Sequence, residues 1–155
     1  MDLTLPSSPK EAESYFNQRY QLPDGQLRVY GREEWFAPVA SGSNPADAMV
    51  ICPCTMGTLA AIAAGLNQKL IERAADVMLK ENRPLILVPR EMPFSTIHLE
   101  NMLKLARSGV TIMPANPGFY QHPKTIEDMV DFVVARILDH LKISHSLIPR
   151  WGEKN

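Results

Sequence analysis

The chain has 155 residues, of which 45% are hydrophobic and 21% charged, and this size and composition fit one globular domain with one core. Its 16 basic and 17 acidic residues give a formal net charge of -1, so no overall field would attract nucleic acid or an acidic membrane. Recognition by bulk charge is therefore excluded, and binding must depend on local sites.

The cellular setting is indicated by the cysteines and by the first residues of the chain, and the histidines bear on metal binding. Cys52 and Cys54 are too close for an ordinary loop-closing disulfide, and no second pair completes a zinc site. The four histidines show no metal-binding spacing, so no metal is proposed. The first 15 residues lack a signal sequence, and no apolar run approaches the roughly 18 residues of a membrane span. We expect a soluble, cytoplasmic protein.

Residues 1–34 are interpreted as an N-terminal connecting segment, and residues 35–155 as the folded domain. The segment mixes proline, serine and charge and carries no buried-strand pattern. A short helix is predicted within it over 8–20, with Ser7 or Ser8 as the N-cap.

From residue 48 onward, strand and helix patterns alternate along the chain. Short continuous apolar runs, each followed by proline or a polar loop, indicate strands buried on both faces at 48–52, 85–89 and 110–114. Helical patterns lie at 58–64, 70–79 and 96–106, and Gly109 occupies a C-terminal cap position after the last of these.

A final helix is predicted over about 126–141, with Thr125 as its N-cap. Its apolar residues form one stripe: Ile126, Val130, Val133, Ile137 and Leu141. The alternation predicts an α/β fold with a parallel sheet, right-handed crossovers and helices on both faces. Three strands are few for such a sheet, and no glycine-rich phosphate loop of the GxGxxG or GxxxxGK type occurs.

Three loops follow the predicted strands, where parallel sheets bind ligands. The loop at 52–58 reads CPCTMGT and offers hydroxyls and backbone N–H groups to a ligand, or it is a tight turn with a helix cap. The loop at 89–94 places Arg90 beside Glu91, as a ligand-binding pair or an ordinary surface ion pair. The loop at 114–123 carries Phe119 and Tyr120, which face a ligand or only pack.

Further cations lie on the predicted helices. Arg73 and Lys80 are two helical turns apart and share one face, which alone would be a solvated edge. Arg136 stands among apolar residues and needs a partner or a phosphate. Together with Arg90, these cations suggest a bound dianion. Trp35 is either a buried anchor or a wall of the ligand pocket.

Seven segments in this order resemble the UbiX-type flavin prenyltransferases, which are related to the Pad-type enzymes. The segments read ASGS (40–43), CPCTMGT, RAADVMLKE (73–81), PLILVPRE, HLENM, ANPGFY and VVARILD. The resemblance covers about residues 35–151. It implies a flavodoxin-like (Rossmann-like) three-layer α/β fold and a homododecamer.

The resemblance also implies an activity. Such enzymes transfer a dimethylallyl group, without a metal, from dimethylallyl phosphate to N5 and C6 of reduced FMN. The prenylated FMN then serves a UbiD-type decarboxylase, including those of ubiquinone biosynthesis.

Carried onto matching positions, the resemblance assigns roles to individual residues. Lys80, Arg90, Tyr120 and Arg136 would hold the substrate phosphate. Glu91 would act in proton transfer, so that the catalytic residues are Glu91, Lys80 and Tyr120. The flavin would contact Ser41, Ser43, Cys54, Thr55, Thr58 and Arg73. Trp35 would close the pocket from a neighbouring subunit.

The sequence departs from the family at its front. The family's first strand, its GASG-type phosphate loop, its second strand and a glutamate have no counterpart here, so the fold is expected to be N-terminally incomplete. We therefore expect this chain to bind FMN weakly and to be a poor catalyst. The alternatives are an FMN-dependent cysteine decarboxylase of the same fold, whose PASANT-type and MNxxMW-type motifs are absent, and a catalytically incomplete fragment that only assembles.

Overall fold

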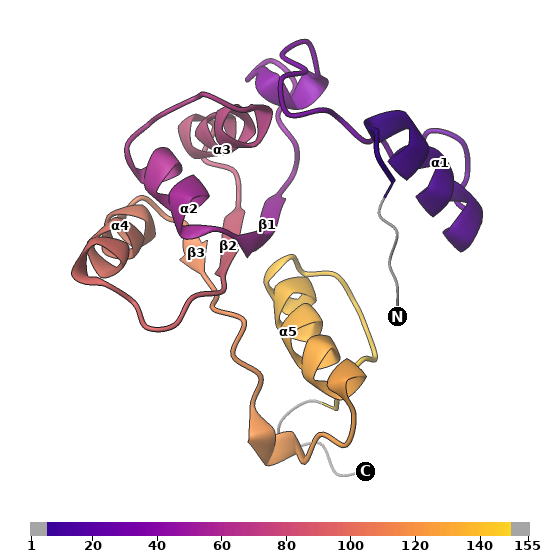
Figure 1. Cartoon of the computed structure of the whole chain (residues 1–155), viewed down its shortest axis with the longest axis vertical. Helices are drawn as coiled ribbons and strands as arrows, with labels where there is room; N and C mark the ends of the chain where they lie inside the picture. Colours follow the sequence, from indigo (N-terminus) through magenta and orange to yellow (C-terminus); the bar gives the residue numbers. More distant parts are fainter. Residues whose placement is uncertain (1–5, 150–155) are drawn as a thin grey trace.

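The computed structural model describes residues 6–149, and its core is a three-stranded parallel sheet (Figure 1). The strands are β1 (Met49–Cys54), β2 (Leu85–Pro89) and β3 (Thr111–Ile112), in the order β1-β2-β3. All pairs are parallel. The predicted α/β class with a parallel sheet is therefore confirmed. Residues 150 and 151, at the end of the family resemblance, lie outside the described residues.

Helices cover both faces of the sheet. The helices α2 (Met56–Ala63), α3 (Leu70–Lys80) and α4 (Thr96–Arg107) lie on one face, and α5 (Ile126–His140) lies on the other (Figure 1). Alternate residues of β2 point to opposite faces, as the pleat of a strand requires. Leu85 and Leu87 belong to the core shared with α2, α3 and α4, whereas Ile86 and Val88 pack with Ile137 of α5.

The strand lengths differ from the prediction at two places. β1 continues to Cys54, two residues beyond its expected end, after a register shift between Ile51 and Cys54. β3 has two residues rather than five. Backbone hydrogen bonds to β2 nevertheless continue beyond these two residues, since the amides of Met113 and Ala115 donate to the carbonyls of Leu87 and Pro89 at 2.8 and 3.2 Å.

Side-chain caps set the helix starts. Ser8 caps α1 (Pro9–Tyr20), which resolves the choice between Ser7 and Ser8. Thr125 caps α5 as predicted, and Gly109, with φ of +87°, follows the end of α4. α2 begins two residues earlier than predicted, because Thr55 acts as its cap.

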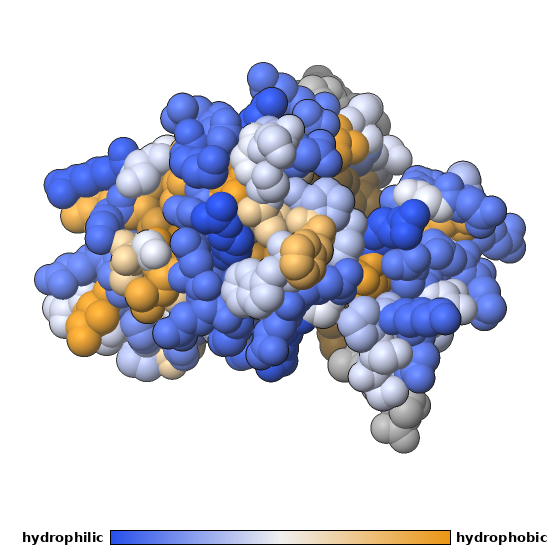
Figure 2. Space-filling model, turned by 90° about the horizontal axis from the view of Figure 1, so that it is seen from above, coloured by the Kyte–Doolittle hydropathy of each residue, from blue (hydrophilic) through white to orange (hydrophobic). Residues whose placement is uncertain are grey.

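The predicted apolar stripe of α5 is only half covered. Ile137 is buried, but Ile126 and Val130 in the first turns of the helix are exposed. On α4, Ile97 and Leu103 are exposed as well. Figure 2 shows hydrophobic surface among hydrophilic side chains at the end of the molecule that carries α2, α3 and α4. These faces are available for contact with other chains.

The segment before the sheet stands apart from the core. α1 buries none of its residues and lies to one side of the sheet (Figure 1). The short 3-10 helix η1 (Pro38–Ala40) follows it, and a second, η2 (Phe119–Gln121), precedes α5. The division into residues 1–34 and 35–155 stays a prediction. Within 6–149, no helix is both long and apolar enough to span a membrane.

Candidate active site

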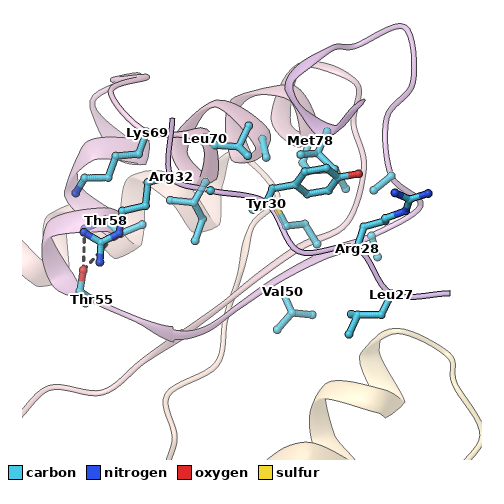
Figure 3. Close-up of a pocket in the computed structure, with 17 residues that line it drawn as sticks. Leu27, Arg28, Tyr30, Arg32, Val50, Thr55, Thr58, Lys69, Leu70 and Met78 are labelled. Atoms are coloured by element: carbon cyan, nitrogen blue, oxygen red, sulfur yellow. Dashed lines mark hydrogen bonds between the residues drawn. The ribbon is translucent and has the colours of Figure 1, made fainter. Parts of the chain in front are cut away.

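A cavity of about 1050 Å³ lies beside β1 (Figure 3). Its walls come from the segment 27–32, the start of β1, the first turn of α2 and one side of α3 from Leu70 to Met78. Leu70, Met78 and Val50 give it an apolar lining. A volume of this size matches the sites that hold cofactors and small ligands.

Two predicted flavin contacts, Thr55 and Thr58, line this cavity at the N-terminus of α2. The backbone N–H of Thr58 donates to Oγ1 of Thr55 at 3.1 Å, and the Thr55 hydroxyl lies 3.0 Å from that of Thr58. Other N–H groups in a first helical turn have no partner within the helix and carry partial positive charge. This end of the cavity therefore suits an anionic or oxygen-rich group.

The cavity also contains cations that sequence reasoning missed. Arg32 and Lys69 lie on the same side of the cavity as Thr55 and Thr58 (Figure 3). Residues 27–32 belong to the predicted connecting segment and carry no strand or helix pattern. The one available signal was the alternation of Arg28, Tyr30 and Arg32, which places all three on one side of an extended chain.

The predicted flavin loop at 41–43 lies against α3. Nε of Arg73 donates to the carbonyl of Ala40 at 3.0 Å. The hydroxyls of Ser41 and Ser43 lie 2.8 Å apart. At the end of the helix, a Cβ on Gly42 would collide with the side chains of Lys80 and Glu81. The structure thus brings the serine loop, Arg73 and Lys80 together.

The cations of α3 already have carboxylate partners. Nη1 of Arg73 lies 3.1 Å from Oδ2 of Asp76, and Nζ of Lys80 lies 2.7 Å from Oε1 of Glu81. All four side chains are about a third or more exposed. Such pairs are weak in water, so an incoming anion can compete for the cations.

The side chain of Cys54 points into the core. Cys54 as a residue is 1% exposed, and its thiol donates to the carbonyl of Thr55 at 3.6 Å. Burial raises the pKa of Cys54 to about 11, because desolvation disfavours the thiolate. A ligand at this position would therefore contact the backbone of Cys54 and not its thiol. Cys52, in contrast, is exposed.

Arg90 and Glu91 follow the last residue of β2 in an exposed loop. Oε1 of Glu91 accepts from the backbone N–H of Met92 at 3.1 Å. Lys80, which precedes β2, lies at the opposite end of that strand. Within a single chain the structure therefore does not bring Lys80 and Arg90 together at one sheet edge.

Tyr120 and Arg136 are both associated with α5. The ring of Tyr120 packs edge-on against Phe132, with ring centroids 5.9 Å apart. Nη1 of Arg136 lies 2.8 Å from Oδ2 of Asp139, and Arg136 lines a groove of about 290 Å³ beside β3. Trp35 is exposed, so it is not the buried anchor that was one reading of the sequence.

Among the described residues, no group of three or more histidine, cysteine, aspartate or glutamate side chains could hold a metal ion. The donors around the cavity and in the 41–43 loop are instead hydroxyls, backbone N–H groups and basic side chains. This set suits phosphate and the polar edge of a ring system.

The fold and this site define an α/β protein with a parallel sheet and a ligand cavity beside its first strand, which Thr55 and Thr58 border just after that strand. A family model described as Flavoprotein matches residues 10–138. The chain is 56% identical over 154 residues to the flavin prenyltransferase UbiX of Pseudomonas aeruginosa, covering 99% of this chain and 74% of the relative. It is also 56% identical over 138 residues to the UbiX of Halalkalibacterium halodurans, covering 89% of this chain and 67% of that relative.

Two solved structures are similar over nearly the whole chain. One is described as a dodecameric FMN-dependent UbiX-like decarboxylase from Escherichia coli O157:H7, with 45% identity, a TM-score of 0.82 and coverage of 98% of this chain and 77% of the other. The second, AnUbiX in complex with FMN and dimethylallyl pyrophosphate, has 42% identity, a TM-score of 0.80 and coverage of 94% and 80%. The chain belongs to the UbiX-type flavin prenyltransferases of the flavoprotein family.

Proposed function

We propose that this chain transfers a dimethylallyl group from dimethylallyl phosphate to reduced FMN. The observation that carries the proposal is the placement of the 41–43 loop against Arg73 and Lys80. This arrangement sets hydroxyls for a flavin next to a cation for a phosphate. The names of the relatives, and the FMN and prenyl diphosphate in one of them, support the same reaction.

The residues of the chain fit FMN. Thr55 and Thr58 present hydroxyls at the start of α2, and Ser41 and Ser43 present hydroxyls beside α3. Arg73 is held over this loop by the carbonyl of Ala40. Reduced FMN, when bound, supplies the electron-rich ring that accepts the prenyl group. Cys54 would contribute through its backbone.

The phosphate of the donor would be bound by Lys80, Arg90, Tyr120 and Arg136. Breaking the carbon–oxygen bond leaves negative charge on the phosphate, and fixed cations stabilise that charge without a metal. Aromatic faces, such as those of Tyr120 and Trp35, would shield the allylic cation. Glu91, in its exposed loop, would relay a proton between the released phosphate and the acceptor.

These residues lie at different places in one chain, so we propose that neighbouring subunits complete the site. Lys80 and Arg90 occupy opposite ends of β2, and Tyr120 and Trp35 are exposed. The apolar surfaces on α4 and the first turns of α5 would be buried between subunits. The solved dodecameric relative supports a homododecamer. In it, Trp35 would close the pocket of an adjacent chain.

The prenylated flavin would leave as a cofactor for a second enzyme. We propose a UbiD-type decarboxylase as its recipient, acting in ubiquinone biosynthesis. The exposed free thiol of Cys52 is consistent with a reducing, cytoplasmic location.

The solved relative from Escherichia coli is described as an FMN-dependent decarboxylase, so decarboxylation is the second candidate function. Mass spectrometry separates the two functions. The chain is incubated with reduced FMN and dimethylallyl phosphate without oxygen, and the flavin is then extracted. We expect flavin that has gained one dimethylallyl group. Unchanged flavin, with carbon dioxide released from an added aromatic or cysteine-derived acid, would favour the decarboxylase.

A further inference from the structure

Asp139 connects Arg136 to the segment that follows α5. Its Oδ2 accepts a hydrogen bond from Nη1 of Arg136 at 2.8 Å, and its Oδ1 lies 3.1 Å from Nε2 of His145. The His145 side chain is only 10% exposed, whereas the Arg136 side chain is 49% exposed. The carboxylate therefore has one partner in solvent and one that is nearly buried.

A hydrogen bond to Nδ1 of His145 determines which ring nitrogen carries the proton. The backbone N–H of Leu147 donates to Nδ1 of His145 at 3.4 Å, so Nδ1 acts as an acceptor. The proton of the neutral ring then lies on Nε2, which donates to Asp139. The imidazole is held from both sides, and it ties residues 145–147 to α5.

This second contact restricts the carboxylate. An exposed Arg–Asp pair three residues apart on a helix is normally loose, because both side chains keep several rotamers. Here the hydrogen bond from His145 limits rotation of Asp139, so the acceptor that Arg136 meets is fixed. A guanidinium has five N–H donors, and those not facing Asp139 remain available for an anion.

We propose that Asp139, held by His145, is a positioning residue that fixes the orientation of Arg136 toward the donor phosphate. The use of Arg136 for that phosphate rests on the proposed function. The Asp139–His145 contact itself does not, since it is a feature of the side-chain geometry. Neither residue touches the reacting atoms.

Three variants test the orientation directly by NMR of the Arg136 guanidinium. The wild type should show restricted guanidinium rotation, seen as separate Nη resonances. Asp139→Asn and His145→Ala should average these resonances, whereas His145→Gln, which keeps an N–H donor, should preserve them. Averaged resonances already in the wild type, or separate ones in all variants, would overturn the proposal.

The kinetic arm uses the same variants with dimethylallyl phosphate and reduced FMN. We expect KM for the phosphate donor to rise about tenfold in Asp139→Asn and roughly threefold in His145→Ala, with kcat nearly unchanged. His145→Gln should stay close to the wild type. Glu127→Gln, which removes an exposed carboxylate from the first turn of the same helix, is the matched control and should behave as the wild type.

The two arms separate the possible failures. If the wild type makes product but Asp139→Asn changes only the melting temperature and not KM, the pair is purely structural and the inference is wrong. If the wild type makes no prenylated flavin, the proposed function fails. The NMR result then still decides whether Asp139 and His145 orient Arg136.

Discussion

Gly42 faces the amine of Lys80 so closely that a Cβ at this position would collide with Nζ of Lys80 and with Oε1 of Glu81. The absence of a side chain lets the serine loop approach the end of α3. This contact places the 41–43 loop, which is expected to bind flavin, beside Lys80, which is expected to bind phosphate.

Gly42→Ala should therefore impair the site more than the fold. The colliding atoms are the ends of flexible side chains, so the unfolding free energy should change by less than about 0.5 kcal/mol. Lys80 would be displaced, and KM for dimethylallyl phosphate should rise roughly fivefold. Urea unfolding and steady-state kinetics measure the two effects. Wild-type KM in this variant would show that the position of Lys80 is not set by Gly42.

Thr55→Ala should destabilise α2. The Thr55 hydroxyl accepts from the N–H of Thr58, and loss of such a cap costs about 1 kcal/mol. Thr55→Ser keeps the acceptor and should restore most of the stability, as followed by thermal unfolding. If Thr55→Ala and Thr55→Ser are equally stable, the hydroxyl does not cap the helix. FMN binding should weaken in Thr55→Ala if the cap residue also contacts the flavin.

The two cysteines should differ in reactivity. At pH 8 iodoacetamide should modify exposed Cys52 in the native protein, whereas Cys54 should react only after unfolding, because burial raises its pKa to about 11 from 9.0. Peptide mapping by mass spectrometry reports both sites. Alkylation of Cys54 at the rate of Cys52 would contradict its burial.

The raised pKa of Cys54 also predicts a stability change at high pH. In the unfolded chain the thiol ionises near pH 9, whereas in the folded chain it ionises near pH 11. Its contribution to stability is thus fully present below pH 9 and is lost as the pH rises through 11. Cys54→Ala removes this contribution and serves as the control for other groups that titrate in the same range.

Gly118→Ala should disturb the Tyr120 ring. A Cβ on Gly118 would lie 2.5 Å from Cε1 of Tyr120 and 3.0 Å from Cζ of Phe132, so the aromatic pair must separate. The Tyr120 side chain is 56% exposed and its ring can move away, so the cost should stay below about 1 kcal/mol, less than overpacking in a closed core. The same substitution in a Tyr120→Phe background should cost as much, since the ring and not the hydroxyl is in the way. Chemical denaturation of the four chains checks this.

Local patterns in the sequence predicted the helices well. Thr125, with acidic residues in the following turn, correctly set the start of α5, and the glycine after α4 marked its end. Continuous apolar runs identified all three strands of the described sheet, because strands buried on both faces need apolar residues throughout. These features depend on a few neighbouring residues, so a single sequence contains them.

The arrangement of the site depended on contacts that a sequence does not show. A spacing of seven placed Arg73 and Lys80 on one helix face, but it did not show that the helix carries Lys80 away from the end of β2 where Arg90 lies. Arg32 enters the cavity through an extended segment with no secondary-structure pattern. The burial of the α5 stripe likewise depends on tertiary packing that a local pattern does not show, since Ile137 is buried and Ile126 is exposed.

The ratio of released phosphate to prenylated flavin tests most directly whether the chain transfers a prenyl group. With reduced FMN and dimethylallyl phosphate, phosphorus NMR counts released phosphate while mass spectrometry counts prenylated flavin in the same sample. We predict one phosphate for each prenylated flavin, with both products lost in Lys80→Met. Phosphate released without added mass on the flavin, or neither product from the assembled wild-type chain, would contradict prenyl transfer.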